Sequence, residues 1–141
     1  MQKIIAANWK MNGSECLLND FSTLVQKKNT DIIICPPFTL LNLAKDILPN
    51  FIKIGAQNCS DQDQGAFTGE ISASMLRERS VSHVIIGHSE RRTIFKESDH
   101  VIFKKIELVT KNKLIPIVCI GETLSEKKAK QTFKVLEKQM D

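Results

Sequence analysis

The sequence predicts an α/β fold in which five parallel strands alternate with helices. Short apolar runs rich in β-branched residues recur along the chain, at residues 4–7, 32–35, 52–55, 84–87 and 115–120. Most of these runs are apolar at every position, which is typical of parallel strands packed on both faces. Their starts are about 28 residues apart, close to the ~30 residues of a strand–helix repeat.

The segments between the runs show helical periodicity, with apolar residues three and four positions apart. Ser or Thr precedes three of these segments, where a hydroxyl can cap the first turn. The predicted helix faces are Leu17, Phe21, Leu24 and Val25 after Ser14; Leu40, Leu43, Ala44 and Ile47 after Thr39; Ile102, Ile106 and Val109 after Ser98; and Ala129, Phe133, Leu136 and Met140 near the end.

This order is a strand–helix unit repeated five times, and right-handed crossovers make all five strands parallel. We therefore predict one domain over residues 1–141, with no linker and no low-complexity segment. Two architectures fit: a complete, open doubly wound sheet, or five of the eight units of a (β/α)8 barrel. The periodicity does not choose between them.

Composition excludes several classes of protein. With 42% hydrophobic and 26% charged residues, the 141-residue chain can form a packed core. Its net charge of +4 is spread along the chain and does not form a nucleic-acid-binding stripe. No apolar run reaches the length of a signal-peptide core or a membrane span. We expect a cytoplasmic protein that binds neither nucleic acid nor membranes.

The cysteines indicate free thiols in a reducing compartment. Cys16, Cys35, Cys59 and Cys119 are widely spaced, with no Cys-x-x-Cys pair and no histidine at the spacing of a zinc finger. We therefore expect neither a disulfide framework nor a metal site.

Polar residues follow the first strand at Asn8 and Lys10. In an extended chain, residues two apart point the same way. An amide and an ammonium group placed together could polarise a carbonyl and hold an anionic substrate. A lysine in a loop is more often simply solvated, so the position alone does not establish this role.

The fourth strand leads to His88, followed by Ser89 and Glu90 at a predicted helix start. The positive end of a helix dipole favours the neutral imidazole, which can donate a hydrogen bond to a developing oxyanion. The other two histidines, His83 at the strand start and His100 at a polar helix start, are predicted to be structural or exposed.

Two further loops suggest supporting roles. After the third strand, Gly65 and Gly69 flank an exposed tip of Phe67 and Thr68, which suits either contact with a partner or an ordinary surface loop. After the fifth strand, nothing in the sequence activates Cys119 as a nucleophile, so we predict that it packs in the core. We expect the neighbouring Glu122 to pair with an arginine or a backbone turn.

Four of these segments together closely resemble signature loops of the triosephosphate isomerase family, in its order and at its spacing. They are residues 8–13 (NWKMNG), 65–70 (GAFTGE), 86–92 (IGHSERR) and 119–122 (CIGE). The resemblance covers the whole chain. It implies a (β/α)8 TIM barrel, present as an incomplete N-terminal portion with about five parallel strands.

The resemblance also implies an activity and roles for individual residues. The family interconverts dihydroxyacetone phosphate and glyceraldehyde 3-phosphate through an enediolate, in glycolysis and gluconeogenesis, without a cofactor. Asn8 and Lys10 match its substrate-binding pair and His88 its electrophile. Thr68, with Phe67 beside it, matches the loop tip that enters the partner subunit of a homodimer. Glu90 and Cys119 match supporting positions.

One part of the family pattern has no counterpart in the sequence. The family's general base is a glutamate after strand six, whereas this chain has 141 residues against the ~250 of a full barrel. Glu90 and Glu122 match supporting positions and do not replace that base. We expect a truncated isomerase that is inactive alone. The alternative is a non-catalytic remnant, or an independently folded five-stranded module that binds phosphate.

Overall fold

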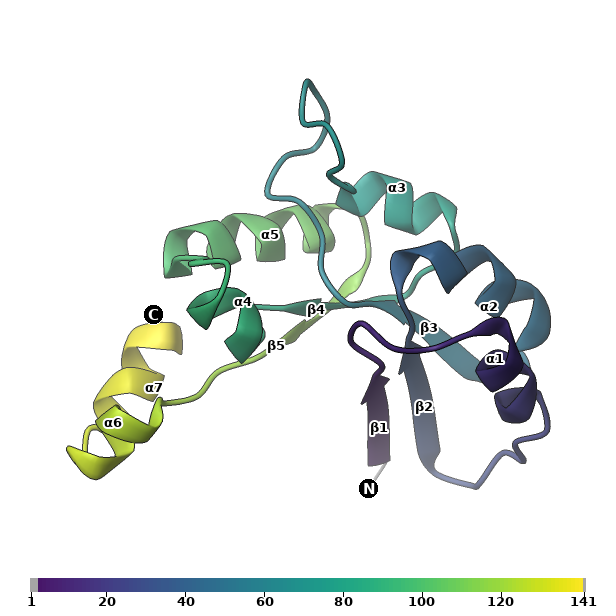
Figure 1. Cartoon of the computed structure of the whole chain (residues 1–141), viewed down its shortest axis with the longest axis horizontal. Coiled ribbons are helices and arrows are strands. Elements are labelled where there is room, and N and C mark those ends of the chain that lie inside the picture. Colours follow the sequence, from purple (N-terminus) through teal and green to yellow (C-terminus); the bar gives the residue numbers. More distant parts are fainter. Residues whose placement is uncertain (1–2, 141) are drawn as a thin grey trace.

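A computed structural model describes residues 3–140 and contains one five-stranded parallel sheet (Figure 1). The strands follow one another in sequence order, β1-β2-β3-β4-β5, so each pairs with its neighbours along the chain. Their bounds are β1 (Lys3–Asn8), β2 (Thr30–Cys35), β3 (Ile52–Ala56), β4 (His83–Ile86) and β5 (Ile115–Val118). The five predicted strands are confirmed.

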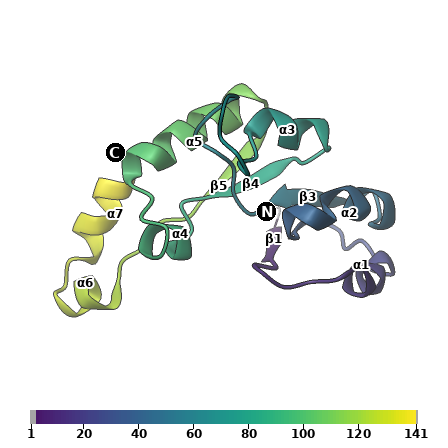
Figure 2. The same cartoon turned by 45° about the horizontal axis from the view of Figure 1, so that its top comes forward.

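The helices have the following bounds: α1 (Glu15–Ser22), the 3-10 turn η1 (Phe38–Leu40), α2 (Leu41–Ile47), α3 (Ala73–Glu78), α4 (Ser89–Thr93), α5 (Asp99–Lys111), α6 (Leu124–Lys128) and α7 (Thr132–Met140). In both views α6 and α7 follow β5 on the far side of the molecule from α1 and β1 (Figures 1 and 2). The five-fold repeat implied a helix after the third strand, but no apolar face was predicted for α3, in which only Ala73 and Leu76 of six residues are buried.

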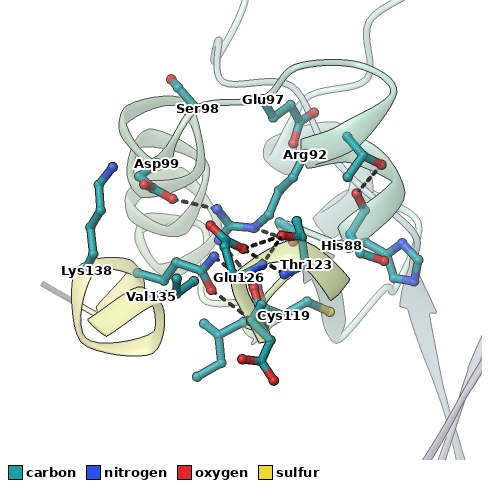
Figure 3. Close-up of a pocket in the computed structure, with 17 residues that line it drawn as sticks. His88, Arg92, Glu97, Ser98, Asp99, Cys119, Thr123, Glu126, Val135 and Lys138 are labelled. Atoms are coloured by element: carbon teal, nitrogen blue, oxygen red, sulfur yellow. Dashed lines mark hydrogen bonds and ion pairs between the residues drawn. The ribbon is translucent and has the colours of Figure 1, made fainter. Parts of the chain in front are cut away.

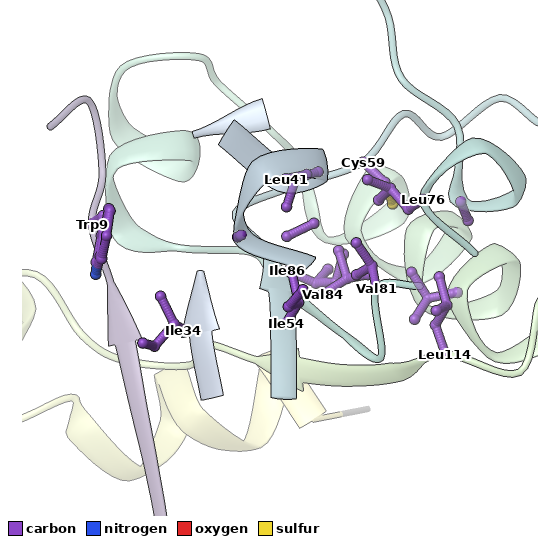
Figure 4. Packing of buried hydrophobic residues seen from close by; sticks show 14 of the residues in the cluster. Trp9, Ile34, Leu41, Ile54, Cys59, Leu76, Val81, Val84, Ile86 and Leu114 are labelled. Carbon is purple, nitrogen blue, oxygen red and sulfur yellow. The ribbon is translucent and has the colours of Figure 1, made fainter. Parts of the chain in front are cut away.

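The main core lies between the sheet and the helices that cover one of its faces (Figure 4). Alternate strand residues such as Ile34, Ile54 and Val84 point into it. The opposite face carries a smaller buried cluster of Ile33, Cys35 and Ile85. Burial of apolar surface on the helix side stabilises the sheet by about 25 cal/mol per Å² removed from water.

The two outer strands leave apolar side chains open to solvent. Ile4 of β1 is 66% exposed and Ile115 of β5 is 54% exposed. Within residues 3–140, each of these strands pairs on one side only. Unpaired edges with exposed β-branched residues favour association with another strand.

Helix α1 begins as predicted but ends early. The Ser14 hydroxyl accepts a hydrogen bond from the Leu17 backbone N–H at 3.2 Å, which confirms the cap. The prediction that Leu24 and Val25 continue the helix is wrong, since α1 ends at Ser22. The side chains of Ser22 and Thr23 donate to backbone carbonyls one turn earlier, a local pattern that competes with helix continuation.

Two other helix boundaries also differ from the prediction. Thr39 does not cap α2 but lies inside η1, directly after a Pro-Pro pair that cannot donate backbone hydrogen bonds. The predicted last helix starting near Ala129 is two helices. A capping box between Thr123 and Glu126 starts α6, Ala129 ends it, and Lys130 turns the chain with a positive φ.

The apolar stripe predicted for the last helix does not pack. Phe133 is 85% exposed, and no residue of α7 is buried. Helix α5 fulfils its prediction, because the Ser98 hydroxyl accepts from the Val101 N–H and the face with Ile102 and Val109 is buried. For α5 and α7 the periodicity indicated a helix but not whether other elements cover it.

We predict that His83 makes stability depend on pH. Its ring is buried, with Nδ1 2.8 Å from the Ser82 hydroxyl. Burial lowers the pKa of His83, the Lys53 ammonium lowers it further, and the Asp31 carboxylate opposes the shift. The neutral ring is thus favoured in the native state. Stability is fully present above the unfolded pKa of about 6.5 and falls as the pH drops below it, by at most about 1.4 kcal/mol per pH unit.

Urea unfolding between pH 7.5 and pH 5 measures this dependence. The His83→Phe variant should lose less stability over this range than the unmodified chain, whereas exposed His100→Gln should behave like the unmodified chain. An identical pH slope for His83→Phe would show that His83 does not contribute.

Candidate functional site

The predicted polar residues gather where β1 and β4 end. The Lys10 ammonium Nζ lies 2.7 Å from Glu90 Oε1, joining two residues 80 positions apart in sequence. The other carboxylate oxygen of Glu90, Oε2, lies 3.4 Å from His88 Nδ1. The Glu90 carboxylate therefore pairs with Lys10 and lies beside His88. The sequence singled out all three residues but not the pairing of Lys10 with Glu90.

The sequence argument assumed that the chain is still extended at Lys10, but β1 ends at Asn8. The φ of Lys10 is +54°, and its backbone N–H donates to Asn8 Oδ1 at 2.9 Å. A non-glycine residue in this region costs about 1–3 kcal/mol, so the surroundings must hold it in place. The Asn8 side chain therefore stabilises the turn at Lys10.

Gln57, directly after β3, completes the support for this turn. Its amide nitrogen donates to the Lys10 carbonyl and to the Cys35 carbonyl, both at 2.9 Å. One side chain thus ties together the ends of β1, β2 and β3. The sequence indicated a role for Gln57 only by placing it directly after β3.

His88 is the N-cap of α4. Its Nδ1 accepts a hydrogen bond from the Glu90 backbone N–H at 3.2 Å. A nitrogen that accepts an N–H is unprotonated, so the proton of the neutral ring lies on Nε2. The hydrogen bond from Lys10 is the main cause that holds the pKa of Glu90 below its usual range, so Glu90 is a carboxylate.

At the end of β5, Cys119 packs beside the small cluster of Ile33, Cys35 and Ile85, as predicted. Burial raises the pKa of its thiol, while nearby Arg92 lowers it. The expectation that Glu122 pairs with an arginine or a backbone turn is not met at Oε2, which is buried without a hydrogen-bond partner among the described residues. The segment 119–122 ends in a loop that leaves this oxygen unpartnered.

All four cysteines are free thiols, in agreement with the sequence analysis. Burial raises the pKa of Cys35 and of Cys59 to about 12. Among residues 3–140, no cluster of three or more His, Cys, Asp or Glu side chains is arranged to hold a metal ion.

The loop after β3 projects from the body of the molecule (top of Figure 1). At its tip Phe67 is 46% exposed, between Gly65 and Gly69, which both have positive φ. The exposed tip agrees with the sequence analysis.

A buried ionic cluster that sequence reasoning missed lies where this loop starts. Lys105 Nζ lies 2.9 Å from Asn58 Oδ1 and 2.6 Å from Glu97 Oε1, which also accepts from Arg91 Nε at 2.5 Å. Burial raises the pKa of Glu97, but the hydrogen bonds from Lys105 and Arg91 outweigh it and lower the pKa overall. The sequence feature that could have indicated this cluster is Lys105, a charged residue on the same face of α5 as the buried Ile102 and Val109.

Comparison with known proteins decides the family. The family model for triosephosphate isomerase matches residues 3–141, nearly the whole chain. The chain belongs to the triosephosphate isomerase family. This confirms the resemblance and favours the partial (β/α)8 barrel over the open doubly wound sheet.

Curated relatives in this family are similar along the whole chain. The triosephosphate isomerase of Aquifex aeolicus is 48% identical over 146 residues, which cover 99% of this chain and 59% of the relative. That of Alkaliphilus metalliredigens is 46% identical over 142 residues, covering 97% of this chain and 57% of the relative. The chain therefore spans less than two thirds of the length of these triosephosphate isomerases.

A pocket of about 610 Å³ lies between the segments that follow β4 and β5. His88, Arg92, Cys119 and Gln139 are among the residues that line it (Figure 3). It separates the loop after β4 from α7. No helix within residues 3–140 is long and apolar enough to cross a membrane.

Proposed function

We propose that this chain supplies the substrate-binding and electrophilic half of a triosephosphate isomerase, acting on dihydroxyacetone phosphate and glyceraldehyde 3-phosphate without a cofactor. The observation that carries the proposal is the Lys10–Glu90–His88 arrangement at the carboxyl ends of β1 and β4. Its support is membership of the family and similarity to the triosephosphate isomerases of Aquifex aeolicus and Alkaliphilus metalliredigens. The protein would act in the cytoplasm, in glycolysis and gluconeogenesis.

The proposed chemistry assigns one task to each group. Removal of a proton from the carbon beside the substrate carbonyl leaves negative charge on the carbonyl oxygen. The Nε2–H of His88 donates to that oxygen, and fixed donors of this kind lower the barrier because they need no reorganisation. The Lys10 ammonium attracts the anionic substrate, with Asn8 and Gln57 holding its backbone. Glu90 orients Lys10 through its carboxylate and His88 through its backbone N–H.

We assign the general base to no carboxylate of residues 3–140. Glu90 is held by Lys10 and by its contact with His88. Glu122 has a buried oxygen and lies on the β5 side of the site. A base must reach within about 3 Å of the proton it removes. We therefore propose that the 141 residues alone do not isomerise triose phosphates at an enzymatic rate.

The second candidate function is a non-catalytic, independently folded module that binds phosphate weakly. The observation that favours it is the core of the five-stranded sheet, which buries side chains such as Leu18, Ile34 and Leu76 completely. Such a core can support folding without further strands.

A chimera distinguishes the two. It joins residues 1–141 to the part of the Alkaliphilus metalliredigens relative that this chain does not match, and is purified from a host without its own isomerase. We expect the chimera to convert glyceraldehyde 3-phosphate, and the 141-residue chain to be slower by at least ~10²–10⁴-fold, the usual cost of losing a general base. A folded but inactive chimera would support the non-catalytic module. Equal rates would place a base within this chain.

We also propose that the complete protein is a homodimer in which the tip of Phe67 and Thr68 enters the partner near Asn8, Lys10 and Glu90. Phe67 is apolar and exposed, as an interface residue is before association. The double variant Phe67→Asp/Thr68→Asp of the chimera should sediment as a monomer with reduced activity. Val25→Asp, at an exposed apolar position after α1, is the control. An unchanged dimer would refute the role of the tip.

A further inference from the structure

We propose that Arg92 is a positioning residue for His88, because its guanidinium fixes the peptide that leads into His88 and ties it to the end of β5. This inference rests on the proposed function only in giving His88 a role in the reaction. The contacts of Arg92 are observed in the structure whatever the function is.

The Arg92 guanidinium is held on three sides (Figure 3). Its Nε donates to the Gly87 carbonyl at 2.9 Å, and its Nη1 lies 2.5 Å from Asp99 Oδ1. Its Nη2 reaches the Cys119 carbonyl at 3.4 Å. The side chain is only 16% exposed. The planar fork of arginine can serve three acceptors at fixed angles, which an ammonium cannot do.

The first of these acceptors controls His88. The Gly87 carbonyl and the His88 backbone N–H belong to one peptide group, which is planar and turns as a unit. Gly87 has a φ of +69°, and a Cβ on it would lie 3.2 Å from Arg92 Nη2 and 3.1 Å from Ile102 Cδ1. Glycine thus leaves room for the guanidinium against the backbone. Rotation of this peptide would change the direction in which the imidazole points.

The Cys119 carbonyl, another acceptor of Arg92, lies at the end of the neighbouring strand β5. The ladder between β4 and β5 continues to the bond from the Cys119 N–H to the Ile86 carbonyl, at 2.8 Å. One residue further along each strand, Arg92 donates to both the Gly87 and the Cys119 carbonyl. Beyond this point the two segments separate toward His88 and Glu122. Beyond it, the Gln139 carboxamide pairs with the N–H and the carbonyl of Gly121 at 2.8 and 3.0 Å. Arg92 is therefore the link between the His88 loop and a segment that is itself held in place.

Asp99 sets the direction of the guanidinium from the first turn of α5. The preceding arginine differs, because Arg91 contacts Glu97 and lies over the Phe95 ring. Because Nε, Nη1 and Nη2 of Arg92 each donate to a protein acceptor, we assign Arg92 a positioning role.

The test uses the chimera with Arg92→Ala, Arg92→Lys and, as the control, exposed Arg77→Ala. We expect Arg92→Ala to lower kcat by about 10–100-fold with KM changed by less than about threefold, since a small displacement of a catalytic group costs this much. Guanidinium ion, which can enter through the adjacent pocket, should restore part of kcat in Arg92→Ala; sodium ion at equal ionic strength should not. Arg92→Lys should stay impaired. A folded Arg92→Ala enzyme with unchanged kcat, or no rescue, would overturn the proposal.

A second measurement covers the case of an unfolded Ala variant or an inactive chimera. In the 141-residue chain, Asp99→Asn weakens the hold on Arg92 without creating a cavity. NMR should show shifted His88 amide and ring nitrogen signals in Asp99→Asn and unchanged ones in Arg77→Ala. Unchanged His88 signals would overturn the positioning role. An inactive unmodified chimera with these shifts would contradict the proposed function but not the positioning role.

Discussion

Replacing His88 by glutamine should lower kcat of the chimera by about 10²–10³-fold, the typical cost of losing one fixed donor to an oxyanion. The structure gives the reason. Nδ1 of His88 is used by the Glu90 backbone N–H, so Nε2 is the only ring nitrogen that can carry a proton toward the substrate. KM should change little, because the donor acts mainly on charge that develops in the transition state.

His100→Gln is the matched control, because His100 is exposed in the first turn of α5 and lies outside the site. NMR of the ring nitrogens at pH 7 tests the tautomer separately and should show Nδ1 without a proton. A loss of less than about threefold in His88→Gln would contradict the electrophile role. A proton on Nδ1 would contradict the hydrogen bond that this atom accepts from the Glu90 N–H.

Lys10→Met should lower kcat/KM by about 10³-fold, equivalent to roughly 4 kcal/mol for two charges 4 Å apart near a protein surface. It also leaves the Glu90 carboxylate without the ammonium 2.7 Å away, so the site becomes negative and repels an anionic substrate. The double variant Lys10→Met/Glu90→Gln should regain part of the loss, which separates this repulsion from the missing attraction.

Lys45→Met, which removes an exposed ammonium in α2, is the control for net charge and should have little effect. Kinetics at several ionic strengths complete the test, since attraction of an anion weakens with added salt. A Lys10→Met enzyme whose kcat/KM equals that of Lys45→Met would contradict the assigned role of Lys10.

The strands and capped helix starts could be predicted because their signals are local. Ser14 and Ser98 cap α1 and α5 through hydrogen bonds within three residues. The ends of helices were harder to place. Whether α1 continued past Ser22 depended on side-chain bonds to the backbone, and whether Phe133 was covered depended on elements far away in the sequence.

The sequence singled out the residues that gather at the ends of β1 and β4, but it did not predict their contacts. Asn8, Lys10, His88 and Glu90 stood out because each lies at or just after the end of a strand, where (β/α)8 barrels place their polar groups. The Lys10–Glu90 ion pair spans 80 positions, and the left-handed turn at Lys10 depends on Gln57 from another strand. Contacts of this kind follow from the curvature of the sheet, which the hydrophobic pattern does not encode.

Mixing two separately purified chains tests most directly whether this chain carries half of an isomerase site. One is the 141-residue chain, and the other is the part of the Alkaliphilus metalliredigens relative that it does not match. We predict no turnover of glyceraldehyde 3-phosphate by either chain alone, turnover by the mixture, and loss of that turnover when the first chain carries His88→Gln. Turnover by the 141-residue chain alone, or turnover by the mixture that survives His88→Gln, would contradict the account.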